Sequence, residues 1–332
     1  MQLPAPRGPL SDFVIETLRT RPPGAQSLVP IEGDPLSGDD FHLALYLCYE
    51  LHYTGIDGVD PAWEWDPALI GFRGHLERVF ESALKELVPY GEGTPRDIVD
   101  KLLAALAAAG GPSVSHFIED QATLEQVHEF VIHRSAYHLK EADPHTWAIP
   151  RLRGPAKAAL VEIQADEYGG GRGDRVHSLL FAKTMAAMGL DASYGAWIDA
   201  IPGVTLATVN LMSMFGLNRR LRGAAVGHLA AFETLSAEPN ARYAAGLRRL
   251  GVKEDALDFF DEHVEADSVH EVIATHDLVG GLTRDEPQLA PDILWGARCL
   301  LALDEIWARR LITQWAGGRS SLRSSESAAS RV

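Results

Sequence analysis

The feature that most limits the fold of this 332-residue chain is a series of apolar segments with helical spacing, several of which begin at capping residues. Thr123 and Gln126 form a capping box ahead of one segment, and Pro144 predicts its end at residue 143. Thr94 and Pro95 predict a cap and a first turn for an earlier helix. The alternation of apolar and polar residues that is typical of half-buried strands is missing.

These patterns predict an all-α fold, built as one multi-helix bundle. The segment Thr205–Met214 has strand propensity, but no hairpin turn flanks it. Leu303, Trp307, Leu311 and Trp315 recur at i, i+4 spacing and are predicted to lie in the core. Helices are expected over residues 40–54, 72–88, 95–109, 123–143, 154–168, 174–188, 204–216, 219–236, 239–250, 252–275 and 291–316.

The chain has no internal repeat and no central linker, so the expected organisation is one core with additions at its ends. Residues 1–39 are predicted to be a partly disordered N-terminal extension, and residues 40–120 to be accessory helices. The main core is expected over 121–318. Residues 319–332 are rich in Ser and Arg without apolar periodicity, which predicts a disordered tail.

The charge balance limits the partners that this chain could bind. Asp and Glu number 46 against 30 Lys and Arg, which gives a net charge of -16. Such a surface repels phosphate backbones and anionic lipids, so neither nucleic acid nor a membrane is expected as a partner. Cys48 and Cys299 are too few for a disulfide framework or a thiolate-bound metal cluster. The first twenty residues lack the apolar run of a signal peptide, so a cytoplasmic location is expected.

One segment carries metal-ligand residue types at helical spacing. His263, Asp267 and His270 are at i, i+4 and i+7, so they fall within an arc of about 60° on a helix. Two imidazoles and a carboxylate on one stripe suit a divalent first-row metal such as iron or manganese. A solvated helix face explains the segment equally well by itself, because Glu262 and Glu271 crowd it.

Two further segments add donors of the same kind. Glu167 precedes three consecutive glycines and His177 follows them, and glycine geometry would allow these two side chains to converge. Glu141 lies near the expected end of a helix, and His145 is expected at the surface or in packing. Together the three segments offer three carboxylates and three imidazoles, enough for two adjacent metal ions in a bundle core. A plain helical corner is the alternative for the glycine segment.

The three stretches LKEADPHTWAIPRL, EIQADEYGGGRGDRVHSLLFAKTM and DEHVEADSVHEVIATHDLVGGL occur in this order. Together they resemble the haem-oxygenase-like diiron oxidases and oxygenases, the iron-containing redox enzymes, and most of all their N-oxygenating members. The resemblance implies a haem-oxygenase-like multi-helix bundle with additional N-terminal helices. The family name describes the scaffold and does not imply that haem is bound.

The resemblance also implies a set of iron ligands and a reaction. The positions that match the family's ligands are Glu141, Glu167, His177, His263, Asp267 and His270. They would hold two Fe(II)/Fe(III) ions per chain and would act with O2 as co-substrate through a peroxo-diferric species. The implied substrate is an amine or amino-acid-like molecule that is N-oxygenated, as in natural product biosynthesis, with an external electron donor.

Two other functions remain open at this point. The same site could carry out oxidative C–C cleavage, decarboxylation or desaturation instead of nitrogen oxygenation. Alternatively, the candidate ligands could form surface ion pairs in a non-catalytic helical binding protein. A homodimer is the default expectation for the assembly, because dimers are the commonest soluble oligomers.

Overall fold

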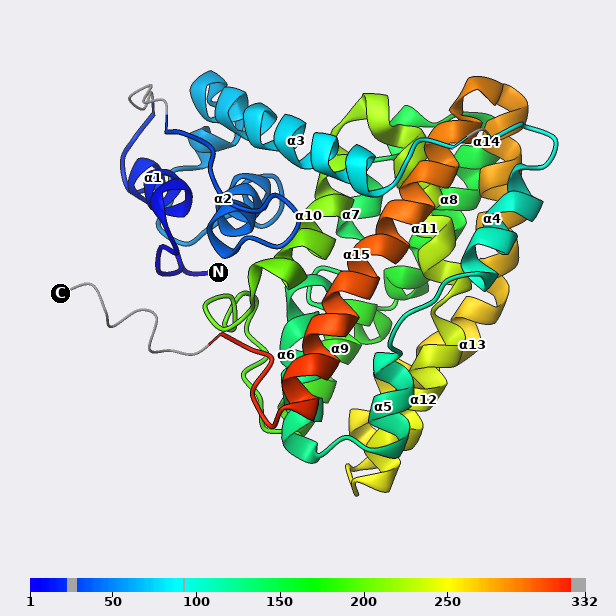
Figure 1. The fold of residues 1–332 in the computed structure, drawn as a ribbon. Helices are drawn as coiled ribbons and strands as arrows, with labels where there is room; N and C mark the ends of the chain where they lie inside the picture. Colours follow the sequence, from blue (N-terminus) through cyan, green and yellow to red (C-terminus); the bar gives the residue numbers. More distant parts are fainter. Residues whose placement is uncertain (23–28, 92, 324–332) are drawn as a thin grey trace.

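The computed structural model describes residues 1–22, 29–91 and 93–323, except for the side chains of residues 265–268. Within these ranges the chain is helical and contains no strand, so the all-α prediction is confirmed. None of the described helices combines the length and apolar character needed to cross a lipid bilayer. The helices of Figure 1 are α1 (Pro9–Leu18), α2 (Asp39–Glu50), α3 (Pro67–Leu87), α4 (Ile98–Ala107), α5 (Val114–Asp120), α6 (Leu124–His138), α7 (Asp143–Thr146), α8 (Gly154–Glu167), α9 (His177–Ala187), α10 (Gly203–Leu217), α11 (Arg222–Thr234), α12 (Ala237–Arg249), α13 (Asp258–Val272), α14 (Gly280–Asp285) and α15 (Ala290–Ala316).

The long helix α15 crosses the molecule and packs along α11 and α10 (Figure 1). Its crossing with α11 is close because small residues face each other. A Cβ atom at Gly227 would overlap the carbonyl oxygen of Ile293, and one at Gly296 would overlap that of Ala224. The predicted apolar stripe of α15, from Leu303 to Trp315, is buried in the core as expected. These contacts fix the scaffold on which the candidate ligands lie.

The N-terminal residues contain a helix that the sequence did not predict. Helix α1 buries Leu10, Val14, Ile15 and Leu18 and packs against α2. Helix α2 in turn packs on α10, so α1, α2 and α3 lie together at one end of the molecule (Figure 1). Residues 1–22 are therefore part of the packed fold, while residues 23–28 lie outside the described residues.

Helix α6 is shorter than predicted. The capping box of Thr123 and Gln126 is present, which confirms its start. It ends at His138 rather than at residue 143, because the chain turns at Ala142, whose φ angle is +75°. A left-handed backbone at an alanine is rare and carries strain. The turn separates Glu141 from the helix and leaves Pro144 to begin α7.

Other helix boundaries also differ from the predictions. Helix α4 begins at Ile98 because the Thr94 hydroxyl donates to the Asp97 carboxylate instead of capping the helix. Helix α5 was not predicted, although Ser113 caps it by accepting a hydrogen bond from the His116 amide. The helix expected over 252–275 begins at Asp258 as α13 and continues into a π-helical segment at 273–279.

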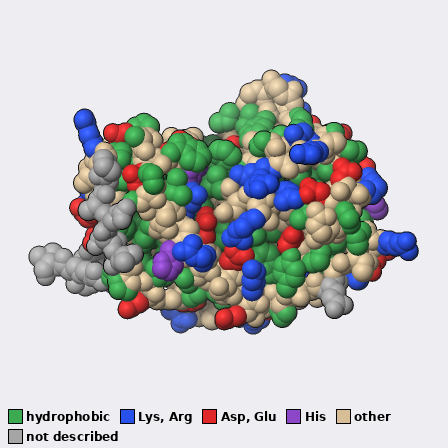
Figure 2. Space-filling view, turned by 90° about the horizontal axis from the view of Figure 1, so that it is seen from above, with side chains coloured by type: hydrophobic (Ala, Val, Ile, Leu, Met, Phe, Trp, Pro, Cys, Tyr) green, Lys and Arg blue, Asp and Glu red, His purple; other side chains and the backbone are tan. Residues whose placement is uncertain are grey.

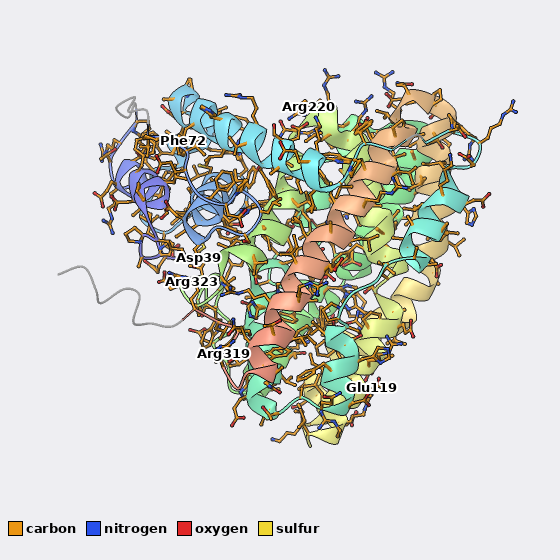
Figure 3. All side chains as sticks on the ribbon, viewed as in Figure 1. Asp39, Phe72, Glu119, Arg220, Arg319 and Arg323 are labelled. Carbon is orange, nitrogen blue, oxygen red and sulfur yellow. The ribbon has the colours of Figure 1, made fainter. Side chains whose placement is uncertain are left out.

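The first residues after α15 are ordered, contrary to the predicted tail. Ser321 is fully buried, and its amide and hydroxyl donate to Glu129 Oε2 at 2.8 and 2.6 Å. Arg323 Nε donates to Asp39 Oδ2 at 3.0 Å, and Figure 3 shows this pair beside the N-terminal helices. The predicted disorder is therefore wrong for residues 319–323, and residues 324–332 lie outside the described residues.

The surface seen from above carries acidic, basic and apolar side chains interspersed (Figure 2). Several basic side chains gather near the middle of this face, but acidic side chains lie beside them. Acidic side chains therefore do not dominate this face, although the net charge of the chain is -16.

Candidate metal centre

The structure places the predicted ligands around one buried centre. Glu141 lies in the turn after α6, and Glu167 ends α8. His177 begins α9, and His263 and His270 lie on α13. All five of these side chains are buried, each at most 6% exposed. The prediction for Asp267 falls on α13 as well, but its side chain lies outside the described residues.

The first cluster of possible ligand atoms comes from Glu141, Glu167, His177 and His263. One ligand atom from each lies within 4.8 Å of the others. His177 Nδ1 is 2.9 Å from Glu167 Oε2, and His263 Nε2 is 3.7 Å from Glu141 Oε1. Three segments of the chain, around Glu141, around the glycine turn and on α13, thus supply two carboxylates and two imidazoles to one point.

A second cluster shares Glu167 with the first and adds His270 and Glu233. His270 Nδ1 is 3.2 Å from Glu233 Oε2 and 3.8 Å from Glu167 Oε1. Because Glu167 belongs to both clusters, its two oxygens can face two neighbouring ions. A carboxylate shared between two groups of donors is the arrangement that a dinuclear site requires.

Glu233 was missed by the sequence analysis. It lies on α11 and is 5% exposed, in a stretch that reads HLAAFETL. A single acid among apolar residues is the signal that could have identified it, because an unpaired buried carboxylate is costly. No spacing rule connects it with the other candidates, since α11 is remote from them in sequence.

The glycine turn brings Glu167 and His177 together. Gly169, Gly170 and Gly171 have φ angles of +75°, +58° and +82°. A Cβ at Gly169 would lie 2.8 Å from the backbone of Arg175 and Val176. Only glycine fits this close return of the chain, which aims the first residue of α9 back at the last residue of α8.

Hydrogen bonds behind the two α13 histidines orient their rings. His263 Nδ1 is 2.7 Å from the carbonyl oxygen of Phe259, which directs Nε2 toward Glu141. His270 Nε2 is 3.2 Å from Asp166 Oδ2, which directs Nδ1 toward Glu167 and Glu233. Metal-bound histidines usually donate their other N–H in this manner, and the donation fixes the tautomer.

His138, in the last turn of α6, is a second residue that the sequence analysis missed. Its Nδ1 lies 2.8 Å from Glu141 Oε1, and its ring packs against Phe181 and Phe259. Glu141 lies in a turn rather than in a helix, so the contact with His138 orients its carboxylate. The pattern His-x-x-Glu across a helix end could have suggested it.

The electrostatics of the centre favour charged carboxylates. Burial alone would raise the pKa of Glu141, but His138 and His263 outweigh it and hold that pKa below its usual range. Burial likewise opposes charge on His177, yet the Glu167 carboxylate raises the pKa of His177. Burial lowers the pKa of His138, which favours its neutral form, and a neutral imidazole can still donate one N–H.

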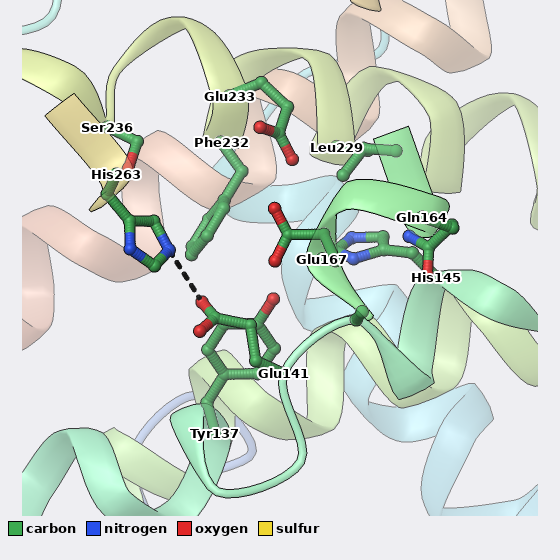
Figure 4. Close-up of a pocket in the computed structure, with 11 residues that line it drawn as sticks. Tyr137, Glu141, His145, Gln164, Glu167, Leu229, Phe232, Glu233, Ser236 and His263 are labelled. Carbon is green, nitrogen blue, oxygen red and sulfur yellow. Dashed lines mark ion pairs between the residues drawn. The ribbon is translucent and has the colours of Figure 1, made fainter. Parts of the chain in front are cut away.

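A small pocket, called the cavity below, lies against the two clusters. Figure 4 shows the carboxylates of Glu141, Glu167 and Glu233 facing this space, with His263 beside Glu141. Its lining residues are Tyr137, Glu141, Ala142, His145, Gln164, Glu167, Leu229, Phe232, Glu233, Ser236 and His263. His145, expected at the surface or in packing, is buried and lines the cavity.

The donor set fits metal ions. Glu141 Oε2 is buried and has no hydrogen-bond partner among the described residues. Unsatisfied buried oxygen and nitrogen atoms are costly unless an ion or ligand pairs with them. Carboxylate and imidazole donors without thiolates suit iron or manganese. The buried positions also disagree with the alternative in which these residues form surface ion pairs.

Comparisons with known proteins agree with this geometry. The family model described as "iron-containing redox enzyme" matches residues 128–305. Nitrosourea synthase from Streptomyces achromogenes subsp. streptozoticus is 27% identical over 241 residues, which are 70% of this chain. The chain spans about half the length of that relative, since the match covers 51% of it. The matched family model contains all the predicted ligand positions and covers more than half of the chain, which therefore belongs to the iron-containing redox enzyme family.

Proposed function

We propose that the chain is a non-haem diiron oxygenase that uses O2. The observation that supports this proposal best is the position of Glu167, which belongs to both clusters of buried donors. Glu141, Glu167, His177 and His263 would hold one iron. Glu167, Glu233 and His270 would hold the other, with Asp267 as a further ligand from α13.

Two ferrous ions bound by these donors would supply the electrons and the open positions needed to activate O2. The protein's own residues would shape the reaction. Phe232 and Leu229 form an apolar wall of the cavity and would exclude water from the site. The hydrogen bonds of His263 and His270 to Phe259 and Asp166 would fix the tautomer and the orientation of the two imidazoles.

The proposed reaction is N-oxygenation of an amine or amino-acid-like substrate. Support for nitrogen as the target comes from the similarity to nitrosourea synthase. Electrons for further turnovers would come from an external donor.

Anaerobic titration with Fe(II) tests the metal part of this proposal. We expect close to two irons per chain, followed by a transient visible absorption band when the loaded protein is mixed with O2. No iron uptake, or uptake without reaction with O2, would contradict a diiron oxygenase.

Mass spectrometry of the products tests the reaction. An amine that gains one or more oxygen atoms on nitrogen supports N-oxygenation. Loss of CO2, loss of two hydrogens or carbon–carbon cleavage would instead assign the same site to decarboxylation, desaturation or C–C cleavage.

A further inference from the structure

Two polar atoms that the metal clusters do not use face the cavity. His145 is 3% exposed and Gln164 is 2% exposed, and both line the cavity beside Glu167. His145 Nδ1 and Gln164 Nε2 have no hydrogen-bond partner among the described residues. In Figure 4 both side chains lie on the opposite side of Glu167 from His263. Buried polar atoms left in this state are expected to pair with an ordered water or with a polar group of a ligand that displaces it.

The remaining atoms of both side chains are held in place by the protein. Gln164 Oε1 accepts a hydrogen bond of 2.8 Å from Thr146, the residue next to His145, so both groups lie at one end of the cavity. The Gln164 NH2 group therefore remains available to donate hydrogen bonds to a ligand. His145 Nε2 lies 3.1 Å from His228 Nδ1, so these two rings share one hydrogen.

Both side chains of this pair, His145 and Gln164, are uncharged. Burial lowers the pKa of His145 to about 4, so its ring is neutral at pH 7. In either tautomer, His145 Nδ1 can bond to a group that has both a donor and an acceptor. The described lining residues include no lysine or arginine. Lys140, next to Glu141 in sequence, is engaged with Glu50 and lies over the rings of Tyr46 and Tyr53.

We infer that His145 and Gln164 form a subsite for an uncharged carboxamide-type group of the substrate. The carboxamide oxygen accepts from the Gln164 NH2 group, and its oxygen or N–H pairs with His145 Nδ1. A carboxylate is disfavoured at this end of the cavity because no lysine or arginine is among the lining residues and both subsite groups are uncharged. This inference rests on the proposed function, and it makes the substrate an amine with an uncharged amide instead of a free amino acid.

Matched probes test the subsite: glycinamide against glycine, and β-alaninamide against β-alanine. Within each pair only the carboxamide or carboxylate differs. Binding is measured by calorimetry on anaerobic Fe(II)-loaded protein and on metal-free protein. We expect at least one amide to bind about tenfold more tightly than its parent acid, the size of effect that one or two hydrogen bonds produce.

The variants Gln164→Met and His145→Phe should each weaken binding of the amide about fivefold to tenfold and leave iron content unchanged. Asn210→Leu is the control, because Asn210 is another buried amide, bonded to His42 away from the cavity. Thermal unfolding of each variant verifies that it is folded.

The outcomes separate this inference from the proposed function. Equal or tighter binding of the acids, amide affinity unchanged in both variants, or no binding of either amide would overturn the subsite. Failure of the wild type to take up iron would overturn the proposed function alone, because amide binding is still measured on metal-free protein.

Discussion

At the scale of single residues, Glu233 distinguishes a dinuclear centre from a mononuclear one. It contributes only to the second cluster, where its carboxylate lies 3.2 Å from His270 Nδ1. We therefore expect Glu233→Ala to lower the iron content from about two to about one per chain while the fold persists. Metal analysis after anaerobic loading measures this change. Glu238→Gln serves as the control, because Glu238 is an exposed acid of α12 that pairs with Arg242 and belongs to neither cluster.

His138 makes a different residue-scale prediction, because it contacts a ligand without belonging to either cluster. Without its N–H the Glu141 carboxylate loses the contact that directs it, so His138→Ala should weaken iron affinity about 10-fold to 100-fold. His138→Asn, which retains a side-chain N–H, should recover part of that loss. His116→Ala, at an exposed histidine of α5, is the matched control, and wild-type affinity in His138→Ala would contradict the positioning role.

At the scale of elements, the glycine turn between α8 and α9 controls the distance between Glu167 and His177. Gly169→Ala places a Cβ 2.8 Å from the backbone of Arg175 and Val176 at a φ of +75°. We expect it to separate the two ligands, weaken iron binding by at least tenfold, and cost about 1–3 kcal/mol of stability. Chemical denaturation and iron titration measure both effects.

Gly170→Ala provides the comparison within the same turn. Its φ is +58°, but a Cβ there meets nothing within 4 Å. It should cost about 1 kcal/mol of stability through backbone strain alone and leave iron affinity close to wild type. Equal loss of iron affinity in both variants would show that the tight return of the chain at Gly169 is not what aligns the ligands.

At the scale of the whole molecule, buried neutral histidines predict sensitivity to acid. Burial lowers the pKa of His133 to about 3 and that of His42 to about 4, against 6.5 for a free side chain. Between the folded and unfolded pKa values, the unfolded chain binds more protons, so stability falls as pH falls. Each such histidine contributes a slope of up to about 1.4 kcal/mol per pH unit.

Urea unfolding of metal-free protein between pH 7.5 and pH 5 measures this dependence. We expect the stability of His133→Gln to depend less steeply on pH, by about the slope that one histidine contributes. His133 bonds to Thr205 and Ser321, neither of which is a candidate metal ligand. An unchanged slope in that variant would mean that His133 does not carry the acid sensitivity.

The sequence by itself determined the helical class and most of the helices, because caps and 3.6-residue periodicity are local properties. Thr123 and Gln126 set the start of α6, and the α15 stripe is buried as its spacing predicts. The motif residues on α13 and around the glycines were also readable as candidate ligands. The divisions between extension, accessory helices and core remain predictions.

The tertiary structure alone decided which carboxylates meet those histidines. Glu233 and His145 come from elements whose sequences carry no ligand spacing, and they reach the centre only because segments remote in sequence line one cavity. It also decided that Ser321 packs into the fold, since its partner Glu129 is remote in sequence. Burial, and with it the pairing of charge, depends on the whole fold, and local patterns do not encode it.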